Sequence, residues 1–222
     1  RNMQNIPGIK SRLGINARAC LIPDNGVWTD LDFSQLELRI LAYLSQDREM
    51  LHIYETGGDI HQITADFMGI DRSIAKNVGF SMVYGGSDDT IAETARMRSR
   101  ARAKQLREMW FTLFPQAGDY INSMNEAVAR GRQIVTTIFG RNIRLPDNEE
   151  DSLGGRQRKA INYPIQGSAA DILKRALLLC KDMDIALQIH DELLLDGPYT
   201  PDMFQLLENI APFSTPISIK YL

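Results

Sequence analysis

The stretch from Arg72 to Gly86, RSIAKNVGFSMVYGG, constrains the fold of this chain more than any other segment. Arg72, Lys76, Phe80 and Tyr84 recur every four residues. On an α-helix each step of four residues drifts by only about 40°, so we expect all four side chains on one stripe about 18 Å long. The stripe would carry two cations near its N-terminal end and two aromatic rings near its C-terminal end.

Such a stripe indicates a nucleotide-binding surface. An amphipathic helix buried in a core would carry aliphatic side chains there instead of arginine and lysine. Cations bind phosphates and aromatic rings stack on bases, so phosphates would lie at one end and sugar and base at the other. A surface helix with a half-buried aromatic edge remains the alternative. Gly85 and Gly86 are expected to end the helix and to let another chain approach closely.

Composition bounds the function classes. The chain has 222 residues, enough for one large domain or two small ones with a sizeable core. Its net charge of −3 means that any basic surface for nucleic acid must be local. Cys20 and Cys180 are too few for a disulfide framework, which indicates a reducing compartment, and with three scattered histidines they argue against a structural zinc site. No apolar run has the length of a membrane span, and no signal peptide is visible.

An acidic strand end precedes the stripe. Residues 27–33, VWTDLDF, alternate as a strand that places Asp30 and Asp32 on the same face. Leu36 and its neighbours up to Leu44 follow helical spacing, so Glu37 falls on the first turn of the next helix. The end of a strand before a helix is a common place for chemistry. A solvated carboxylate at a strand exit is the alternative.

A second acidic segment follows the stripe. Residues 185–195, IALQIHDELLL, form two apolar runs around His190, Asp191 and Glu192. This pattern predicts a strand, a tight turn and a second strand with the acids at the tip. Adjacent carboxylates repel each other unless water or a metal compensates, so a metal site gains weight here.

The other expected elements are mostly helical. They are a partly helical region 46–71 broken at Gly57-Gly58, a helical region 90–114, a helix 119–130 after Pro115 and Gly118, a β-hairpin 133–145 that turns at Gly140-Arg141, a mobile loop 146–157, a long helix from Arg158 to about Asp182 that Pro164 bends or restarts, a helix 201–210 and a closing strand 216–222.

Several polar residues on these elements leave alternatives open. His61 could be a phosphate contact or simply an exposed helix histidine. Arg158, Asn162 and Gln166 lie in a row that could read base edges or only cap and solvate the helix. Six cations between residues 90 and 114 could track a phosphate backbone, although their spacing favours a solvated face; they are Arg96, Arg98, Arg100, Arg102, Lys104 and Arg107.

Three segments resemble the A, B and C motifs of family A DNA polymerases, the group of bacterial DNA polymerase I and its phage and organelle relatives. They are DFSQLELR at 32–39, RSIAKNVGFSMVYG at 72–85 and IHDE at 189–192. Further segments resemble the family in the same order: NMQNIP at 2–7, GRNIRLPD at 140–147 and NYPIQGSAADILKRA at 162–176. The resemblance covers nearly the whole chain, and the loop between His61 and Arg72 is closer in length to phage versions.

The resemblance implies an α+β fold: a right-hand palm, formed by an antiparallel sheet with helices, and mostly helical fingers. Residues 1–45 would begin the palm with the metal-binding strand. Residues 46–157 would be the fingers with the nucleotide helix 72–84, and residues 158–222 would complete the palm with the catalytic hairpin. The chain begins at Arg1, so we expect a fragment without its thumb. The thumb and an exonuclease-like domain would lie upstream in a longer chain.

The resemblance also implies the chemistry. Asp32 and Asp191 would hold two Mg²⁺ ions, with Mn²⁺ as an alternative, and the backbone carbonyl of Phe33 would be a further ligand. One ion would lower the pKa of the primer 3′-hydroxyl, and the other would neutralise the triphosphate and the leaving pyrophosphate. Glu192 matches an auxiliary acidic neighbour of this site. Lys76 counts as catalytic as well as nucleotide-binding.

The remaining site residues also follow from the resemblance. For the nucleotide it assigns Arg72, Lys76 and His61 to the triphosphate, Gln35 to a place near the phosphates, Phe80 to the sugar and base, Tyr84 to the floor of the pocket and Glu37 to a steric gate against a ribose 2′-hydroxyl. For the template or primer it assigns Gln4, Arg158, Asn162, Gln166 and His190.

The expected partners are primer–template DNA and deoxynucleoside triphosphates, for a monomer without a membrane partner in the cytoplasm of a bacterial or phage-infected cell. Two other hypotheses about the function remain. A relative of single-subunit RNA polymerases would need space in place of Glu37 and tends to carry Met in place of Phe80. A non-catalytic fragment that only binds nucleic acid or a protein would not need Asp32, Asp191 and Lys76 intact.

Overall fold

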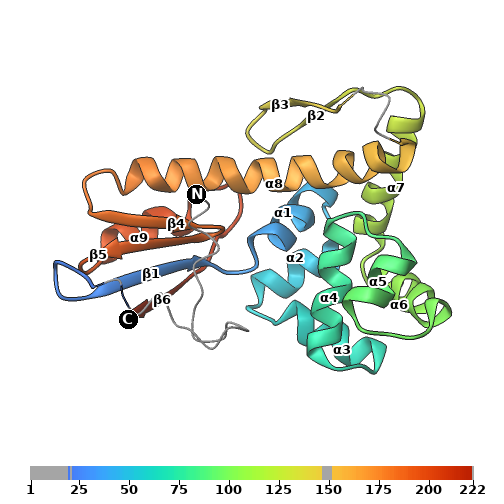
Figure 1. Ribbon diagram of the computed structural model, residues 1–222, viewed down its shortest axis with the longest axis horizontal. Coiled ribbons are helices and arrows are strands. Elements are labelled where there is room, and N and C mark those ends of the chain that lie inside the picture. The colour runs from blue at the N-terminus through green and yellow to red at the C-terminus, as the bar shows by residue number, and fades with distance from the viewer. Residues whose placement is uncertain (1–19, 21, 147–151, 222) are drawn as a thin grey trace. The chain divides into compact units, whose positions relative to one another are not determined.

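The computed structural model describes residues 20, 22–146 and 152–221. Figure 1 shows an antiparallel sheet and a set of helices, which confirms the α+β class. The elements are β1 (Trp28–Phe33), α1 (Leu36–Ser45), α2 (Arg48–Glu55), α3 (Ile60–Met68), α4 (Arg72–Val83), α5 (Asp88–Thr94), α6 (Arg100–Leu113), α7 (Pro115–Ala129), β2 (Ile134–Thr136), β3 (Asn142–Arg144), α8 (Leu153–Leu179), β4 (Ile185–Ile189), β5 (Glu192–Asp196), α9 (Pro201–Glu208) and β6 (Ile217–Tyr221). No helix in the described part of the chain is long and apolar enough to cross a membrane.

The chain packs into two compact units. Unit 1 combines the chain up to Leu36 with Ile172–Leu222, and unit 2 is Glu37–Asp171. Helix α1 and the larger part of α8 pack within unit 2. The palm and fingers at residues 1–45, 46–157 and 158–222 stay a prediction. Helix α8 is continuous across the division (Figure 1).

Unit 1 is built on a four-stranded antiparallel sheet in the order β4-β5-β1-β6. Alternation along β1 buries Thr29, Leu31 and Phe33 and leaves Asp30 and Asp32 on the other face. The predicted strand 27–33 and the predicted strand–turn–strand at 185–195 are both confirmed.

In unit 2 the break at Gly57-Gly58 is confirmed between α2 and α3. The helical region 90–114 is divided into α5 and α6. The division arises because Arg96 adopts a left-handed φ of 53° and the Ser99 hydroxyl caps α6, accepting a hydrogen bond from the amide of Arg102 at 3.3 Å.

The predicted start of a helix at residue 119 is wrong. Helix α7 begins at Pro115, since proline suits the first helical turn where its missing N–H has no helical partner. Gly118 lies inside the helix, where a Cβ atom would meet the Phe111 ring at 3.0 Å. The glycine therefore marks a close contact between two helices instead of a helix boundary.

The predicted loop 146–157 is also wrong in part. Residues 147–151 lie outside the described residues, but α8 already begins at Leu153, and the Ser152 hydroxyl accepts a hydrogen bond from the amide of Gly155 at 3.1 Å. Pro164 does not end the helix, and the Ser168 hydroxyl donates to its carbonyl. The glycine-rich sequence concealed the first turn of this helix, because glycine lowers helix propensity by about 1 kcal/mol.

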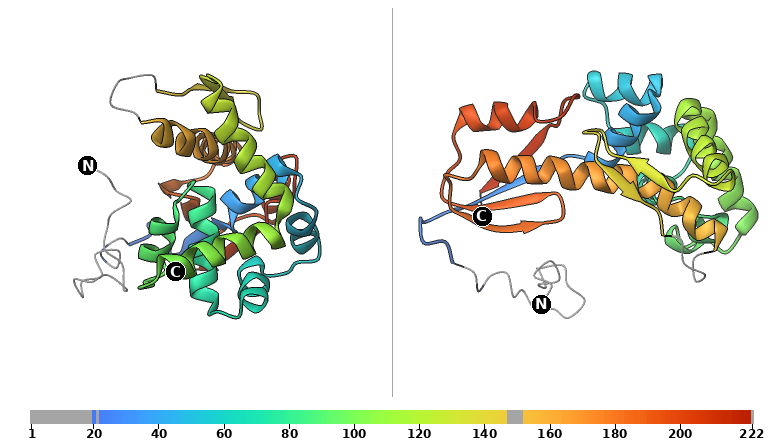
Figure 2. Two further views of the ribbon diagram at one scale, coloured as in Figure 1. Left: turned by 90° about the vertical axis from the view of Figure 1, so that its right-hand side faces the viewer. Right: turned by 90° about the horizontal axis from the view of Figure 1, so that it is seen from above.

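The β2–β3 hairpin is confirmed with shorter strands than predicted, and it lies along α8 (Figure 2). Arg141 Nε bonds the Asp171 carboxylate at 2.8 Å, and the amide of Ile138 donates to the Ser168 hydroxyl at 3.0 Å. Gly167 permits this packing, because a Cβ atom there would meet Ile143 Cδ1 at 2.6 Å.

Candidate active site

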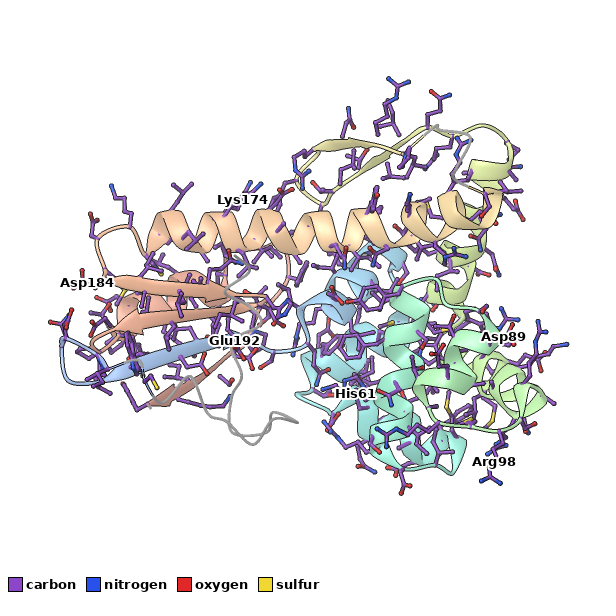
Figure 3. The ribbon with its side chains drawn as sticks, viewed as in Figure 1. His61, Asp89, Arg98, Lys174, Asp184 and Glu192 are labelled. Atoms are coloured by element: carbon purple, nitrogen blue, oxygen red, sulfur yellow. The ribbon has the colours of Figure 1, made fainter. Side chains whose placement is uncertain are left out.

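In unit 1 three acidic residues gather at one end of two neighbouring strands. Asp32 on β1 is the register partner of Glu192 on β5. The amide of Phe33 donates to the carbonyl of Asp191 at 3.1 Å, which ties the end of β1 to the β4–β5 turn. Figure 3 shows Glu192 on this sheet. Carboxylates opposite each other in register repel in the absence of a cation, so the arrangement suits a metal ion.

Two residues beside these acids hold an uncommon backbone conformation. Gln35 has a φ of 55° and His190 a φ of 52°. Positive φ is uncommon for residues other than glycine, and such strain concentrates at functional sites. Both were predicted site residues, and both lie next to the segments that carry Asp32 and Asp191.

The donor set fits Mg²⁺. Carboxylate and carbonyl oxygens are its preferred protein ligands, and it is usually held by one or two carboxylates together with substrate phosphates. Among the described residues no group of three or more His, Cys, Asp or Glu side chains is placed to hold a metal ion. Asp32, Asp191 and the Phe33 carbonyl are oxygen donors of the kind that Mg²⁺ prefers.

In unit 2 the predicted stripe is confirmed along one face of α4, with Tyr84 at the C-cap position directly after the helix. Ala75, Val78 and Met82 are buried on the opposite face, while Arg72, Lys76 and Tyr84 are exposed. Lys76 Nζ lies 5.7 Å from the centroid of the Phe80 ring. The Phe80 and Tyr84 rings stack with centroids 6.5 Å apart.

His61 lies against the same stripe. Its ring centroid is 6.0 Å from that of Phe80, and the residue is only 4% exposed, so the alternative of an exposed helix histidine is wrong. Burial lowers the pKa of His61 to about 4, and the positive charges of Arg72 and Lys76 act in the same direction against the opposing effect of Asp59. The imidazole is therefore neutral at pH 7.

Arg72 is held by a residue that the sequence pattern did not single out. Asp59 caps the N-terminus of α3, and its Oδ2 atom accepts a hydrogen bond from Arg72 Nε at 2.7 Å. An aspartate that follows a glycine pair and precedes a helical run is a known start signal, so the cap could have been found in the sequence. The bond to Arg72 could not.

Glu37 and Tyr84 meet although they are far apart in the sequence. The Tyr84 hydroxyl donates to the Glu37 carboxylate, at 3.0 Å from Oε2 and 3.2 Å from Oε1. A charge-assisted bond of this kind orients the carboxylate of the predicted steric gate beside the ring of the predicted pocket floor.

Gly85 ends the stripe and packs against α8. A Cβ atom at Gly85 would come within 3.2 Å of the Cα atom of Arg158. The sequence predicted a close approach by another chain at this glycine, but in the structure a helix of the same chain makes the close approach. Asn162, one turn after Arg158, keeps its Nδ2 atom buried and without a hydrogen-bond partner among the described residues, whereas Gln166 is exposed. Gln4 lies outside the described residues.

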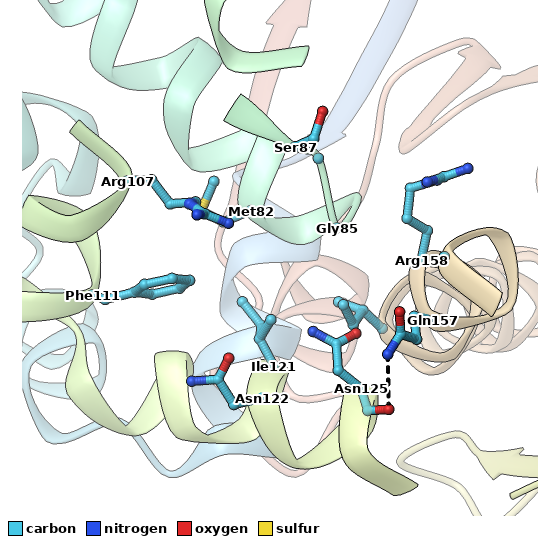
Figure 4. A pocket seen from close by; sticks show the side chains of 13 residues that line it. Met82, Gly85, Ser87, Arg107, Phe111, Ile121, Asn122, Asn125, Gln157 and Arg158 are labelled. Carbon is cyan, nitrogen blue, oxygen red and sulfur yellow. Dashed lines mark hydrogen bonds between the residues drawn. The ribbon is translucent and has the colours of Figure 1, made fainter. Parts of the chain in front are cut away.

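A cavity of about 210 Å³ lies beside this contact (Figure 4). Met82, Phe111 and Ile121 line its apolar side. Asn125 and Gln157 line the polar side, and the Gln157 side chain donates to the Asn125 carbonyl at 3.1 Å. The cavity adjoins the C-terminal end of α4, where the resemblance expects the base of the nucleotide.

Three of the six cations between residues 90 and 114 form ion pairs within unit 2. Arg100 pairs with Asp89 at 3.2 Å, Lys104 with Glu108 at 3.8 Å and Arg107 with Asp88 at 2.9 Å. Figure 3 labels Asp89 on α5 and Arg98 in the segment between α5 and α6. These pairs favour the solvated face over a phosphate-binding stripe.

Comparisons with known proteins agree with these motifs. The model of DNA polymerase family A matches residues 1–206. DNA polymerase I of Caldicellulosiruptor bescii is 36% identical over 219 residues, covering 89% of this chain and 25% of that protein. The thermostable DNA polymerase I of Thermus aquaticus is 32% identical over 244 residues, covering 99% of this chain and 29% of that protein.

A solved structure extends the likeness to the fold. The POL domain of Pol1 from M. smegmatis, in complex with DNA primer-template and dNTP, matches with a TM-score of 0.85 and 30% identity, covering 99% of this chain and 44% of that one. The chain thus spans 25% to 29% of the length of the two polymerases compared above. Since the family model covers most of its residues, the chain belongs to DNA polymerase family A.

Proposed function

We propose that this chain carries the catalytic and nucleotide-binding parts of a template-directed DNA polymerase, which adds deoxynucleotides to a primer 3′ end by two-metal phosphoryl transfer. The observation that carries the proposal is the strand register that sets Asp32 opposite Glu192 and beside the Asp191 turn. Primer-template DNA and a dNTP bound to the M. smegmatis relative support the choice of substrates.

Unit 1 would hold the metal ions through Asp32, Asp191 and the Phe33 carbonyl, with Glu192 and His190 beside them. Bound Mg²⁺ would supply activation of the primer hydroxyl and neutralisation of charge on the triphosphate and leaving group. The hairpin keeps the acids on backbone that is fixed by strand pairing, so little reorganisation is needed during the reaction.

Unit 2 would bind the nucleotide along α4. Arg72 and Lys76 would neutralise phosphate charge, and neutral His61 would donate a hydrogen bond without adding a charge. Phe80 would pack against the sugar, and Tyr84 would lie under the base. In phosphoryl transfer such positioning and charge stabilisation account for most of the catalysis. Arg158, Asn162 and Gln166 would contact template or primer from α8.

The pair of Glu37 and Tyr84 favours deoxynucleotides over ribonucleotides. The tyrosine hydroxyl fixes the carboxylate in place, so a 2′-hydroxyl could be seated only by displacing it. This argues against a relative of the RNA polymerases, and the intact acidic register argues against a non-catalytic fragment.

The test is primer extension by the full natural protein that contains these residues, with Mg²⁺ and either deoxynucleotides or ribonucleotides. Asp32→Asn should abolish extension and leave the sheet intact. Asp30→Asn is the matched control, since Asp30 lies on the same face of the same strand and pairs with Lys220 at 3.9 Å. Activity of Asp32→Asn above about a hundredth of wild type would exclude the metal assignment.

A further inference from the structure

We infer that Asp59 is a positioning residue for the triphosphate, acting through Arg72. The inference rests on the proposed function and extends it to a residue that does not itself touch the nucleotide. It arises from two groups of unit 2 that share one carboxylate: the backbone amides at the N-terminus of α3 and the Arg72 side chain.

The two oxygens of Asp59 have separate partners. Its Oδ1 accepts hydrogen bonds from the backbone amides of His61 at 2.9 Å and Gln62 at 3.3 Å. Its Oδ2 accepts from Arg72 Nε at 2.7 Å. The helix cap therefore fixes the carboxylate, and the fixed carboxylate in turn fixes the guanidinium.

The bond to Asp59 engages only the Nε edge of Arg72. Within the described residues no acceptor bonds the two terminal nitrogens, and the side chain is 48% exposed. A guanidinium offers planar donors on both edges, so the terminal nitrogens can bind a phosphate while Nε stays on Asp59. Without this anchor a long, exposed arginine would lose rotamer freedom on binding the nucleotide, and that loss weakens affinity.

The Asp59 carboxylate also lowers the electrostatic repulsion between neighbouring positive charges in the nucleotide-free protein. Arg72 and Lys76 lie one turn apart on α4, and the His61 ring packs against Phe80 of the same helix. Asp59 offsets their repulsion, and the bonds from Arg72 and from the His61 and Gln62 amides lower its own pKa against the opposing effect of burial. The lowered pKa favours the ionised carboxylate that binds the Arg72 guanidinium.

Substitutions can separate the cap from the ion pair. Asn caps a helix about as well as Asp, so Asp59→Asn keeps the bonds to α3 and removes the charged bond to Arg72. Asp71→Asn is the matched control. It removes the same charge directly before Arg72, and the Asp71 side chain makes no capping bond and no ion pair with the guanidinium.

The experiment measures binding of inorganic tripolyphosphate by calorimetry and the apparent KM for dATP in primer extension, on the full natural protein. Asp59→Asn should bind both ligands about three- to tenfold more weakly than Asp71→Asn, as expected for one side chain left unanchored. The kcat at saturating dATP, duplex affinity in gel shifts and the thermal midpoint should match those of Asp71→Asn, because the helix cap is kept. In an Arg72→Ala background, adding Asp59→Asn should change binding by less than about twofold.

The outcomes are distinct. Equal or tighter binding by Asp59→Asn than by Asp71→Asn would overturn the inference, because Asp59 would then only repel the phosphates. An undiminished effect in the Arg72→Ala background would also overturn it. A wild-type protein that binds tripolyphosphate in an Asp59-dependent way but extends no primer would instead refute the proposed polymerase function.

Discussion

The buried His61 predicts how the stability of unit 2 depends on pH. The side chain is 4% exposed, and burial lowers its pKa from 6.5 to about 4. In the unfolded chain the imidazole is hydrated and takes up a proton near pH 6.5. Replacing His61 by Gln removes the titrating group and keeps a polar side chain of similar length.

The lowered pKa of His61 decides whether the free energy of unfolding rises or falls with pH. Above pH 6.5 the imidazole is neutral in both states, so it adds no pH dependence. Between pH 6.5 and about 4 only the unfolded state binds the proton, and the free energy of unfolding falls as the pH falls. Each pH unit in this range costs about 1.4 kcal/mol, so lowering the pH from 7.5 to 5.0 should cost about 2 kcal/mol.

Urea unfolding at pH 7.5 and 5.0 measures this difference. The wild type should lose about 2 kcal/mol more than His61→Gln between the two values. His52→Gln is the control, because His52 is exposed on α2 and should leave the wild-type difference unchanged. Burial opposes the lowering, but the bonds from Arg72 and from the Gln62 and His61 amides lower the pKa of Asp59 below its ordinary value, so its stabilisation is lost on the acidic side of this range.

An independent measurement is the NMR titration of the imidazole. Its midpoint in the folded protein should lie near pH 4. A midpoint near 6.5, or an equal loss of stability in wild type and His61→Gln, would show that the imidazole is hydrated in the folded state. The reasoning that treats His61 as a neutral donor to the triphosphate would then fail.

Glu37→Ala should admit ribonucleotides, lowering the selectivity for deoxynucleotides over ribonucleotides by several-fold to thousand-fold, about 1–4 kcal/mol. Primer extension with each nucleotide set measures this selectivity. Unchanged selectivity would disprove the steric gate. Lys76→Ala should raise the apparent KM for nucleotides far more than the dissociation constant for duplex DNA; the reverse pattern in kinetics and gel shifts would mean that the stripe faces the DNA. Gly167→Ala should destabilise unit 2 by about 1–2 kcal/mol in urea unfolding, because its Cβ atom would meet Ile143 at 2.6 Å and Thr137 at 2.9 Å. An unchanged midpoint would show that the hairpin shifts away at no cost.

Features that lie within one element could be predicted from the sequence. The stripe of Arg72, Lys76, Phe80 and Tyr84 depends only on helical spacing, and the face shared by Asp30 and Asp32 depends only on strand alternation. Both hairpins also followed from local patterns. The family motifs extended this local information to the roles expected of each residue.

Helix boundaries depended on more than local pattern. Pro115 and Gly118 were expected to precede a helix, yet they form its first turns, because Ala117 donates its amide to the buried carboxylate of Asp47 at 3.0 Å. The same carboxylate caps α2 through Met50. The hydrogen bond between Asp47 and Ala117 cannot be predicted from the residue spacing of either segment.

The contacts that tune the candidate site were decided by the tertiary structure alone. Sequence alone made His61 a candidate, but packing against Phe80 buried it and lowered its pKa. The sequence predicted that Glu37 and Arg72 lie at helix starts. Only the tertiary structure shows that Tyr84 bonds Glu37 and that Asp59 bonds Arg72. The periodicity of the sequence predicts which side chains share one face of a helix or strand. The pKa and the hydrogen bonds of a side chain depend instead on the residues from other parts of the chain that pack against that face.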